Sequence, residues 1–467
     1  MKKFFLIIST IFFILYLPNL FDFQFFFSST QLIVLKLLMI MVIFWITEII
    51  PPSITALFPV LVLPLLSEIE SKAVLSSYSS SVVFLILGGF IIALGFQESN
   101  LHNRLALGIL NKFGDTKLKV LISISLLTAS LSMLFSNTAT CLLMLPIVKS
   151  IIDENFKNEK NTSNFNNFLL LAIAYSASIG GMMTPIGTIP NAILLGFLNE
   201  NYYLKIDFKK WFVYVAPLAL SLIFVLLTLF SFKIKNVRQK ISTKNIYQKY
   251  LNMGNFSKNE KVASFIIILT IILWVFKSNL NSLLEIKITD SIIAIFGASL
   301  FFIIPAKNGE AMINYKWFKN IPWNILILFG GGLALASLVI SSGLAKQITF
   351  FLNDFKNINL FLLILFITFL TSILTEFTSN TATTFLLLPV LSLFADTNNI
   401  DLTQLLIPFI LAASCAFMMP IATPPNAIIY SNNSFKILFM VRNGFLMNII
   451  AITIISTYVY FTGGLSK

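Results

Sequence analysis

The pentapeptide Ser-Asn-Thr-Ala-Thr occurs twice in the chain, at residues 136–140 and 379–383, each time inside an apolar stretch. A proline follows each copy at the same distance, Pro146 and Pro389. Hydroxyl and amide groups can donate hydrogen bonds to an anion and can offer neutral oxygen atoms to a small, hard cation. Polar, helix-breaking sequence at membrane depth is costly unless it lines a cavity. The two copies therefore predict a polar cavity inside an apolar protein.

A second pair of matched blocks follows the pentapeptides, at residues 183–191 and 418–426. Both contain prolines and a small residue, Gly187 or Ala422, and both end in asparagine. Proline removes a backbone donor and interrupts a helix, so we expect unwound stretches within full spans, with freed carbonyls that suit a cation. Matched breaks in two halves of a chain are typical of the binding site of a secondary transporter.

Two other classes of membrane protein fit the sequence less well. A membrane-embedded enzyme requires a nucleophile beside a base, whereas the single histidine, His102, lies near a span end and no metal-ligand cluster occurs. A permanently open channel does not require two broken hairpins. We therefore predict a transporter and not an enzyme.

Arginine occurs only at Arg104, Arg238 and Arg442, none of them near a pentapeptide. An anion must then be held by helix N-termini, amides and hydroxyls, with bound cations supplying the positive charge. Because proton relays generally use embedded carboxylates or histidine, we infer Na⁺ as the coupled ion. Glu376, the one carboxylate close to a motif, is predicted to be structural and bonded to hairpin donors. No organic cofactor is expected.

The composition predicts an all-α integral membrane protein. Of its 467 residues, 57% are hydrophobic and 11% are charged, whereas roughly a quarter are charged in soluble domains. We expect about eleven membrane-spanning helices, each needing about 20 apolar residues. They are predicted near residues 4–20, 31–48, 51–67, 79–98, 166–197, 209–231, 262–278, 288–304, 322–340, 403–430 and 438–462.

The two segments that carry the pentapeptides, 118–150 and 358–394, are predicted to be re-entrant hairpins. A break at Ser136 leaves arms of roughly 15 residues, too short to cross the membrane. The repeat extends to Leu87-Gly88-Gly89 and Phe329-Gly330-Gly331, which we expect to favour close helix packing. The predicted organisation is an N-terminal span (1–30), a first half (31–231), a basic loop (232–261) and a second, inverted half (262–463).

Charge orients the predicted spans. The net charge is +13, and eight basic residues cluster within residues 233–261, which fits a cytoplasmic loop and gives no reason to expect nucleic acid. The same count places the N-terminus, Lys307, Lys316 and Lys319 in the cytoplasm, and we expect a multi-pass protein of the cell (inner) membrane. Lys205, Lys209 and Lys210 fall on the outside, against the rule.

The chain resembles the divalent anion:sodium symporter family, which carries dicarboxylates, citrate or sulfate, and in particular its bacterial dicarboxylate members. The likeness covers nearly the whole chain from about residue 31 and rests on highly specific motifs. These are the paired Ser-Asn-Thr sequences, Thr375-Glu376-Phe377, the block at 422–426, and Thr47-Glu48 followed by Pro51. Glu48 itself is predicted to cap a helix end.

The resemblance implies a homodimer that works by an elevator motion of a transport domain against a scaffold. It implies one sodium site at Ser132, Ser136, Asn137 and the Gly187 carbonyl, and another at Thr375, Asn380 and the carbonyls of Thr378 and Ala422. The substrate carboxylates would meet Asn137, Thr138, Asn380 and Thr381, beside Thr423 and Pro424. Ile189 departs from the family pattern, which usually has proline there.

The presence of both asparagines favours symport over exchange. Two facing anion sites suit a C4 dicarboxylate such as succinate, malate or fumarate, moved with more than one Na⁺. Citrate or sulfate symport, anion exchange and sodium/proton antiport remain alternatives.

Overall fold

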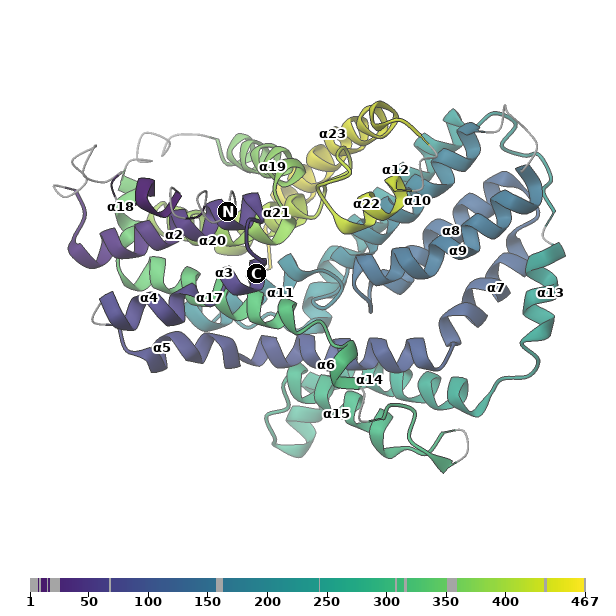
Figure 1. Ribbon diagram of the computed structural model, residues 1–467, viewed down its shortest axis with the longest axis horizontal. Helices are drawn as coiled ribbons and strands as arrows, with labels where there is room; N and C mark the ends of the chain where they lie inside the picture. The colour runs from purple at the N-terminus through teal and green to yellow at the C-terminus, as the bar shows by residue number, and fades with distance from the viewer. Residues whose placement is uncertain are drawn as a thin grey trace.

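Helices build the described part of the chain (Figure 1). The computed structural model describes residues 7, 10–14, 16, 26–66, 69–156, 163–242, 244–306, 309–314, 317–350, 359–431 and 435–465. Most of the expected span at 4–20, together with Lys307 and Lys316, lies outside the described residues. Within them, the only β-type pairings are isolated bridges at Thr116–Lys240 and Pro305–Ala311.

The helices of the first half follow one another closely in sequence. They are α2 (Ser29–Thr47), α3 (Pro52–Thr55), α4 (Phe58–Leu66), α5 (Ser71–Ser76), the 3-10 helix η2 (Ser77–Ser79), α6 (Ser81–Glu98), α7 (Leu101–Phe113), α8 (Lys117–Ser132), α9 (Asn137–Phe156), α10 (Ser163–Met182), α11 (Ile189–Tyr202) and α12 (Phe208–Lys233).

The second half repeats this pattern of long apolar helices and short ones. After α13 (Lys244–Asn252), which lies in the basic loop, come α14 (Lys258–Leu284), α15 (Asp290–Ile303), α16 (Trp317–Asn320), α17 (Trp323–Ser341), α18 (Leu344–Phe350), α19 (Leu360–Phe377), α20 (Asn380–Thr397), α21 (Leu402–Ala413), α22 (Pro424–Tyr430) and α23 (Ile437–Thr462).

Local sequence signals define where several helices begin. Ser28 and Gln31 form a reciprocal capping box at the start of α2, and Ser257 and Glu260 form another at the start of α14. Each box satisfies backbone N–H groups that have no partner within the helix. Proline stands in the first turn of α11 and α22, where its missing N–H costs nothing.

Eight helices are long and apolar enough to cross a membrane within the described residues. This agrees with a multi-pass, all-helical membrane protein. Three expected spans are each divided in two: 51–67 into α3 and α4, 166–197 into α10 and α11, and 403–430 into α21 and α22. The eight helices are Ser29–Thr47, Ser71–Glu98, Asn164–Met182, Phe208–Lys233, Lys258–Leu284, Trp323–Ser341, Leu360–Phe377 and Ile437–Thr462.

The broken helices and the pentapeptide segments interlock at the centre of the molecule. The helix after the second break, α22, packs on α9 and α10, whereas the helix after the first break, α11, packs on α20 and α21 (Figure 1). In the most apolar 18-residue stretch of α10, 89% of the residues are buried, against 28% in that of α14. The two halves therefore share one core, and α14 lies at the edge with its apolar side chains facing outward.

Small residues allow the surrounding helices to pack closely. α15 lies along α6, and a Cβ at Gly88 would come within 2.7 Å of Ala294. Similarly, a Cβ at Gly331 of α17 would lie 2.0 Å from the carbonyl oxygen of Ala56, which follows α3. The two glycine motifs thus act as close-packing positions, as helix interfaces in membranes favour.

The basic 232–261 loop is attached to the α7–α8 connection. Lys117 and Leu118 donate backbone hydrogen bonds of 3.1 and 2.9 Å to Gln239 and Val237. From α7, buried Arg104 forms a 2.6 Å ion pair with Glu260 and donates to three backbone carbonyls of the loop. These attachments had not been predicted, because the partners are far apart in sequence. Helix α7 had not been predicted either, because its amphipathic sequence is not apolar enough to be recognised as a span.

Candidate functional site

Both pentapeptides line a single cavity of about 490 Å³. Ser136, Asn137 and Thr138 reach it from the start of α9, and Ser379, Asn380 and Thr381 reach it from the start of α20. The two unwound blocks supply further walls. The predicted residues found in this lining are Ser136, Asn137, Thr138, Gly187, Asn380, Thr381, Ala422, Thr423 and Pro424, with Ile189 beside them.

Each pentapeptide begins a helix after a short break. α8 ends at Ser132 and α9 begins at Asn137, while α19 ends at Phe377 and α20 begins at Asn380. The Ser136 hydroxyl accepts from Ala139 N at 3.3 Å, and the Ser379 hydroxyl accepts from Ala382 N at 3.1 Å. The other first-turn N–H groups are without helical partners, so two partly positive helix N-termini face the cavity. Such termini favour anions.

The two asparagines are oriented in the same way. Ser132 Oγ donates to Asn137 Oδ1 at 2.7 Å, and Thr375 Oγ1 donates to Asn380 Oδ1 at 2.8 Å. This hydrogen bond directs each amide oxygen back toward the preceding helix. Each Nδ2 group has no hydrogen-bond partner among the described residues, although both side chains line the cavity. The amides thus offer an oxygen on one side and free donors on the other.

Oxygen atoms converge beside the first asparagine. A Cβ at Gly187 would lie 2.5 Å from Gly181 O and 2.8 Å from Ser132 O, and one at Gly181 would press on Asn137 Oδ1. Carbonyl and amide oxygens therefore converge on these two glycines, where there is no room for a methyl group. Neutral oxygens at such spacing suit a small, hard cation. Gly181 had not been predicted, and the pair Gly180-Gly181 just before the break was the available signal.

The matching position in the second half also gathers oxygens. Thr375 Oγ1 lies 2.8 Å from Asn380 Oδ1 and 2.8 Å from Ala413 O. The Thr375 hydroxyl has one proton and can donate it fully to only one of these two oxygens. The other oxygen therefore faces the hydroxyl oxygen without a proton between them. The Thr378 hydroxyl donates a hydrogen bond to Leu374 O at 2.9 Å, so the group of Thr378 that is left to contact a cation is its carbonyl. This arrangement also fits a cation.

Two asparagines that the sequence analysis had given no role hold the unwound blocks. Asn191 Nδ2 donates to Gly181 O, Met182 O and Thr184 O, at 2.9 to 3.3 Å. Asn426 Nδ2 donates to Ala416 O at 2.9 Å and to Met419 O at 3.0 Å. These bonds satisfy carbonyls freed by the break, as buried backbone groups require. Thr423 caps α22 by accepting from Asn426 N at 3.3 Å.

Glu376 is a fully buried structural carboxylate. It accepts hydrogen bonds from Met418 N at 2.9 Å, Met419 N at 2.8 Å and Asn448 Nδ2 at 2.7 Å. The donors thus belong to the unwound block and to α23, and the prediction that they lie in the hairpin was wrong. A buried carboxylate needs several donors to offset its lost hydration, and the freed N–H groups of a broken helix supply them.

Charge is almost absent from the cavity. Its lining in the described chain includes neither lysine nor arginine, and its one carboxylate is Glu48. Glu48 ends α2 in a left-handed conformation with φ 48°, which agrees with the predicted cap. An anion in this cavity would be held by amides, hydroxyls, helix N-termini and any bound cation.

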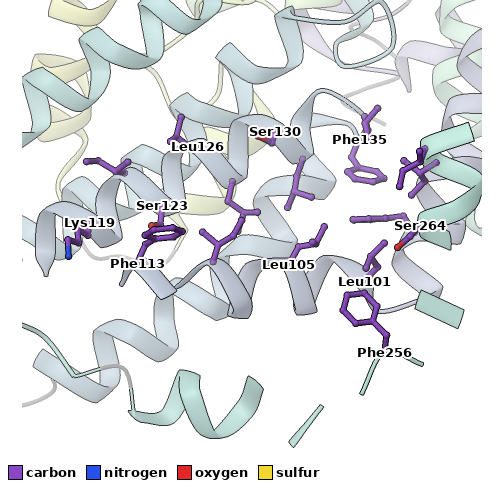
Figure 2. Close-up of a pocket in the computed structure, with 18 residues that line it drawn as sticks. Leu101, Leu105, Phe113, Lys119, Ser123, Leu126, Ser130, Phe135, Phe256 and Ser264 are labelled. Atoms are coloured by element: carbon purple, nitrogen blue, oxygen red, sulfur yellow. The ribbon is translucent and has the colours of Figure 1, made fainter. Parts of the chain in front are cut away.

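A cavity that is distinct from the polar one has a mainly apolar lining. It measures about 810 Å³ and lies between α7, α8 and the start of α14, lined by side chains such as Leu101, Leu105, Leu126 and Phe135 (Figure 2). Its polar contributions come from Lys119 and three serines, and Lys119 is paired with Asp115 at 2.9 Å. An apolar groove of this kind does not provide the donors that a dianion needs.

Two solved structures share the fold of this chain. The YdaH transporter of Alcanivorax borkumensis superposes with a TM-score of 0.57 at 10% identity, covering 84% of this chain and 88% of that one. MtrF of Neisseria gonorrhoeae, from a class of antimetabolite efflux pumps, gives 0.56 at 11% identity, with 83% of each chain covered. The fold is thus shared with helical membrane transporters, which agrees with paired broken helices around a cavity.

Sequence relatives define the family. A profile described as the sodium:sulfate symporter transmembrane region matches residues 1–463. The sodium-dependent dicarboxylate transporter SdcS of Staphylococcus saprophyticus is 35% identical over 451 residues, covering 93% of this chain and 86% of that protein. SdcS of Staphylococcus aureus is 37% identical over 433 residues, covering 89% and 83%. The chain belongs to the sodium:sulfate symporter family, which confirms the family resemblance and the prediction of a transporter rather than an enzyme.

Proposed function

We propose that this protein is a sodium-coupled symporter that imports a C4 dicarboxylate such as succinate, malate or fumarate. The observation that carries the proposal is the single cavity lined by two equivalent asparagine-led helix N-termini. Each terminus offers an amide donor, a hydroxyl and free backbone N–H groups to one carboxylate. The SdcS relatives are named sodium-dependent dicarboxylate transporters, which supports the same substrate class.

Sodium has a physical role in this site. A doubly charged anion in a cavity without lysine or arginine needs positive charge from elsewhere. Two Na⁺, one at Ser132, Ser136, Asn137 and Gly187 and one at Thr375, Thr378, Asn380 and Ala422, would supply it. Because each asparagine would bind a cation through Oδ1 and the anion through Nδ2, binding of the two ligands would be coupled. More than two Na⁺ per cycle would make transport electrogenic.

The substrate groups are assigned on the same geometry. Asn137 and Thr138 would hold one carboxylate, and Asn380 and Thr381 the other. Thr423 and Pro424 would form the wall beside them. Ile189 replaces a proline that the family usually has at the start of α11, next to the first anion site.

Alternating access is proposed to follow an elevator motion. The segments 118–150 and 358–394 would be re-entrant hairpins in two inverted halves, 31–231 and 262–463, after an N-terminal span (1–30). The interlocked core of α8 to α12 and α19 to α23 would move as one body against α2 to α6, α14, α15 and α17. A homodimer would hold the scaffold in the cell (inner) membrane with the N-terminus and the 232–261 loop in the cytoplasm.

Sulfate is the second candidate substrate, because the matching family profile is described as a sodium:sulfate symporter. Two facing anion sites favour a molecule with a charged group at each end over a single compact ion. Citrate transport and anion exchange remain alternatives. Sodium/proton antiport is less well supported, because Glu48 is the one titratable side chain among the described residues that line the cavity.

The direct test is uptake of labelled succinate into proteoliposomes driven by an inward sodium gradient. We expect saturable uptake that requires Na⁺ and is inhibited by malate and fumarate. Potassium in place of sodium is the control. Displacement of sodium-driven uptake by sulfate, with no effect of succinate, would overturn the dicarboxylate assignment.

A further inference from the structure

The lysines at 205, 209 and 210 lie at the end of the molecule opposite the basic 232–261 loop. Helix α12 separates Asp207 from that loop by 26 residues, about 39 Å at ~1.5 Å per residue. If the basic loop is cytoplasmic, these lysines and Lys287, which follows α14, face the outside. Positive charge on the outer face runs against the usual distribution and therefore calls for a physical reason.

A polar cavity of about 510 Å³ lies at this end, between the α11–α12 connection and the α14–α15 connection. We name it the outer vestibule. Lys205, Lys277 and Lys287 line it, together with Asp207 and Asp290. Lys209 and Lys210 do not line it.

The two carboxylates of the outer vestibule share one lysine, Lys277. Lys277 Nζ lies 2.8 Å from Asp290 Oδ1 and 3.9 Å from Asp207 Oδ2. Asp290 also accepts from Phe208 N at 3.0 Å, and Asp207 accepts from Lys210 N at 2.8 Å. Both acids thus stand at helix N-termini, where the helix dipole offsets negative charge.

The other two lysines of the vestibule, Lys205 and Lys287, are available to bind an anion. Lys205 and Lys287 are exposed and have no ion-pair partner within the described part of the chain. Asn199 adds an amide to the same lining and likewise has no hydrogen-bond partner among the described residues. The vestibule therefore presents two lysines without a carboxylate partner and a polar side chain, and its three lysines against two aspartates give the lining a net charge of +1.

Only a thin wall separates the outer vestibule from the substrate cavity. Leu85 and Pro185 line the vestibule, while their chain neighbours Ile86 and Ile186 line the substrate cavity. The partition is one turn of α6 and the first unwound block. An anion in the vestibule is therefore next to the broken helix that carries the proposed first sodium site.

We propose that the outer vestibule is a second, low-affinity binding site for the divalent anion, which captures it from outside before it enters the substrate cavity. The inference rests on the proposed function for the identity of the anion. Lys205 and Lys287 attract the dianion and raise its rate of association, whereas binding in the substrate cavity uses no lysine. Electrostatic capture of this kind is screened by salt.

The kinetic test uses intact cells, so that labelled succinate meets only the outer face. The double variant Lys205→Gln, Lys287→Gln is compared with Lys209→Gln, Lys210→Gln, which removes the same charge outside the vestibule. At low ionic strength and constant sodium we expect the first pair to raise KM about fivefold with an unchanged maximal rate. The difference should vanish when choline chloride raises the ionic strength, and Lys205→Arg, Lys287→Arg should behave as wild type. Equal KM values for the two glutamine pairs would overturn the proposal.

A second measurement does not depend on transport. Both native cysteines are buried, so the variant Asn199→Cys introduces an accessible thiol in the outer vestibule. A negatively charged thiosulfonate should label it faster than a positively charged one, and external succinate or sulfate should slow that labelling. Loss of this preference in the Lys205→Gln, Lys287→Gln background is expected. If dianions protect the thiol but succinate is not carried, the vestibule stands and the proposed substrate falls; absence of both preference and protection overturns the vestibule.

Discussion

The two unwound blocks are equivalent in sequence but are held in different ways. In the first half, the hydroxyl of Thr184 donates to the carbonyl of Met133. In the second half, Glu376, which takes the place of Met133, accepts from the backbone of Met418 and Met419. The first arrangement joins neutral groups, and the second places a carboxylate among three donors. The unwound block is thus held by a hydroxyl hydrogen bond in the first half and by a buried carboxylate in the second half.

The two halves thus have the asparagine hydrogen bonds in common and differ in the contacts that support the unwound blocks. The Ser132–Asn137 and Thr375–Asn380 hydrogen bonds are common to both halves, so the asparagines should matter equally. The supporting contacts differ, and changes there should affect one half more than the other.

The largest expected effect is removal of either asparagine. Asn137→Ala and Asn380→Ala should each reduce sodium-driven uptake at least tenfold, because a hydrogen bond to a charged ligand contributes roughly 1.5–3 kcal/mol and 1.4 kcal/mol is a factor of ten. Size-exclusion profiles in detergent should match wild type. Near-normal uptake by both variants would place the site elsewhere.

The next comparison exchanges the small residues at the two proposed cation positions. Gly187→Ala places a methyl group 2.5 Å from Gly181 O and 2.8 Å from Ser132 O. Overpacking costs about 1–3 kcal/mol, so we expect the sodium concentration for half-maximal uptake to rise about tenfold.

Ala422→Gly is the matched change in the second half. It removes a methyl group from a position that already accommodates one and should shift the sodium dependence far less. An equal shift for Gly187→Ala and Ala422→Gly would contradict the convergence of oxygens at Gly187.

A smaller effect concerns stability. Glu376→Gln puts an amide where two backbone N–H groups need an acceptor, and should destabilise the protein by about 2 kcal/mol, whereas Thr184→Val should cost about 1 kcal/mol. Thermal unfolding in detergent would report a larger drop in Tm for the first variant. A larger drop in Tm for Thr184→Val would mean that Glu376 stabilises the second half no more than Thr184 stabilises the first.

The smallest effect on activity is expected from single cysteines introduced to report the membrane topology. Single cysteines in place of Lys119 and Lys149, at the two ends of the first hairpin, should leave uptake intact. An impermeant thiol reagent should reach both only from the cytoplasmic side. Labelling from opposite faces would show that 118–150 crosses the membrane, and the inverted arrangement of the two halves would then be abandoned.

Much of the fold could be predicted from hydrophobicity and from local breaks. The apolar runs at 31–48, 209–231 and 438–462 correspond to α2, α12 and α23. α7 was missed because its short amphipathic sequence is not apolar enough to be recognised as a span. The predicted arm length of roughly 15 residues concerned the first hairpin only. In the second predicted hairpin, α19 has 18 residues and the hydropathy of a span.

The site was predictable where it repeats and not where it relies on distant partners. Repetition identified Asn137, Asn380, Gly187 and Ala422. It could not identify Gly181, whose role depends on the carbonyls that surround it, nor the donors to Glu376, one of which comes from Asn448 on α23.

The sequence by itself determined that this chain is an apolar membrane protein with two equivalent polar breaks and without arginine beside them. Those properties are local, since composition, proline and repeated motifs act within a few residues. Only the tertiary structure decided that both breaks face one cavity and that each amide points its oxygen toward the preceding helix. It also decided that Lys205, Lys277 and Lys287 line a second cavity, where Lys205 and Lys287 have no ion-pair partner among the described residues. These features depend on which distant groups are packed together, because a hydrogen bond or an ion pair is defined by its partner's position in space.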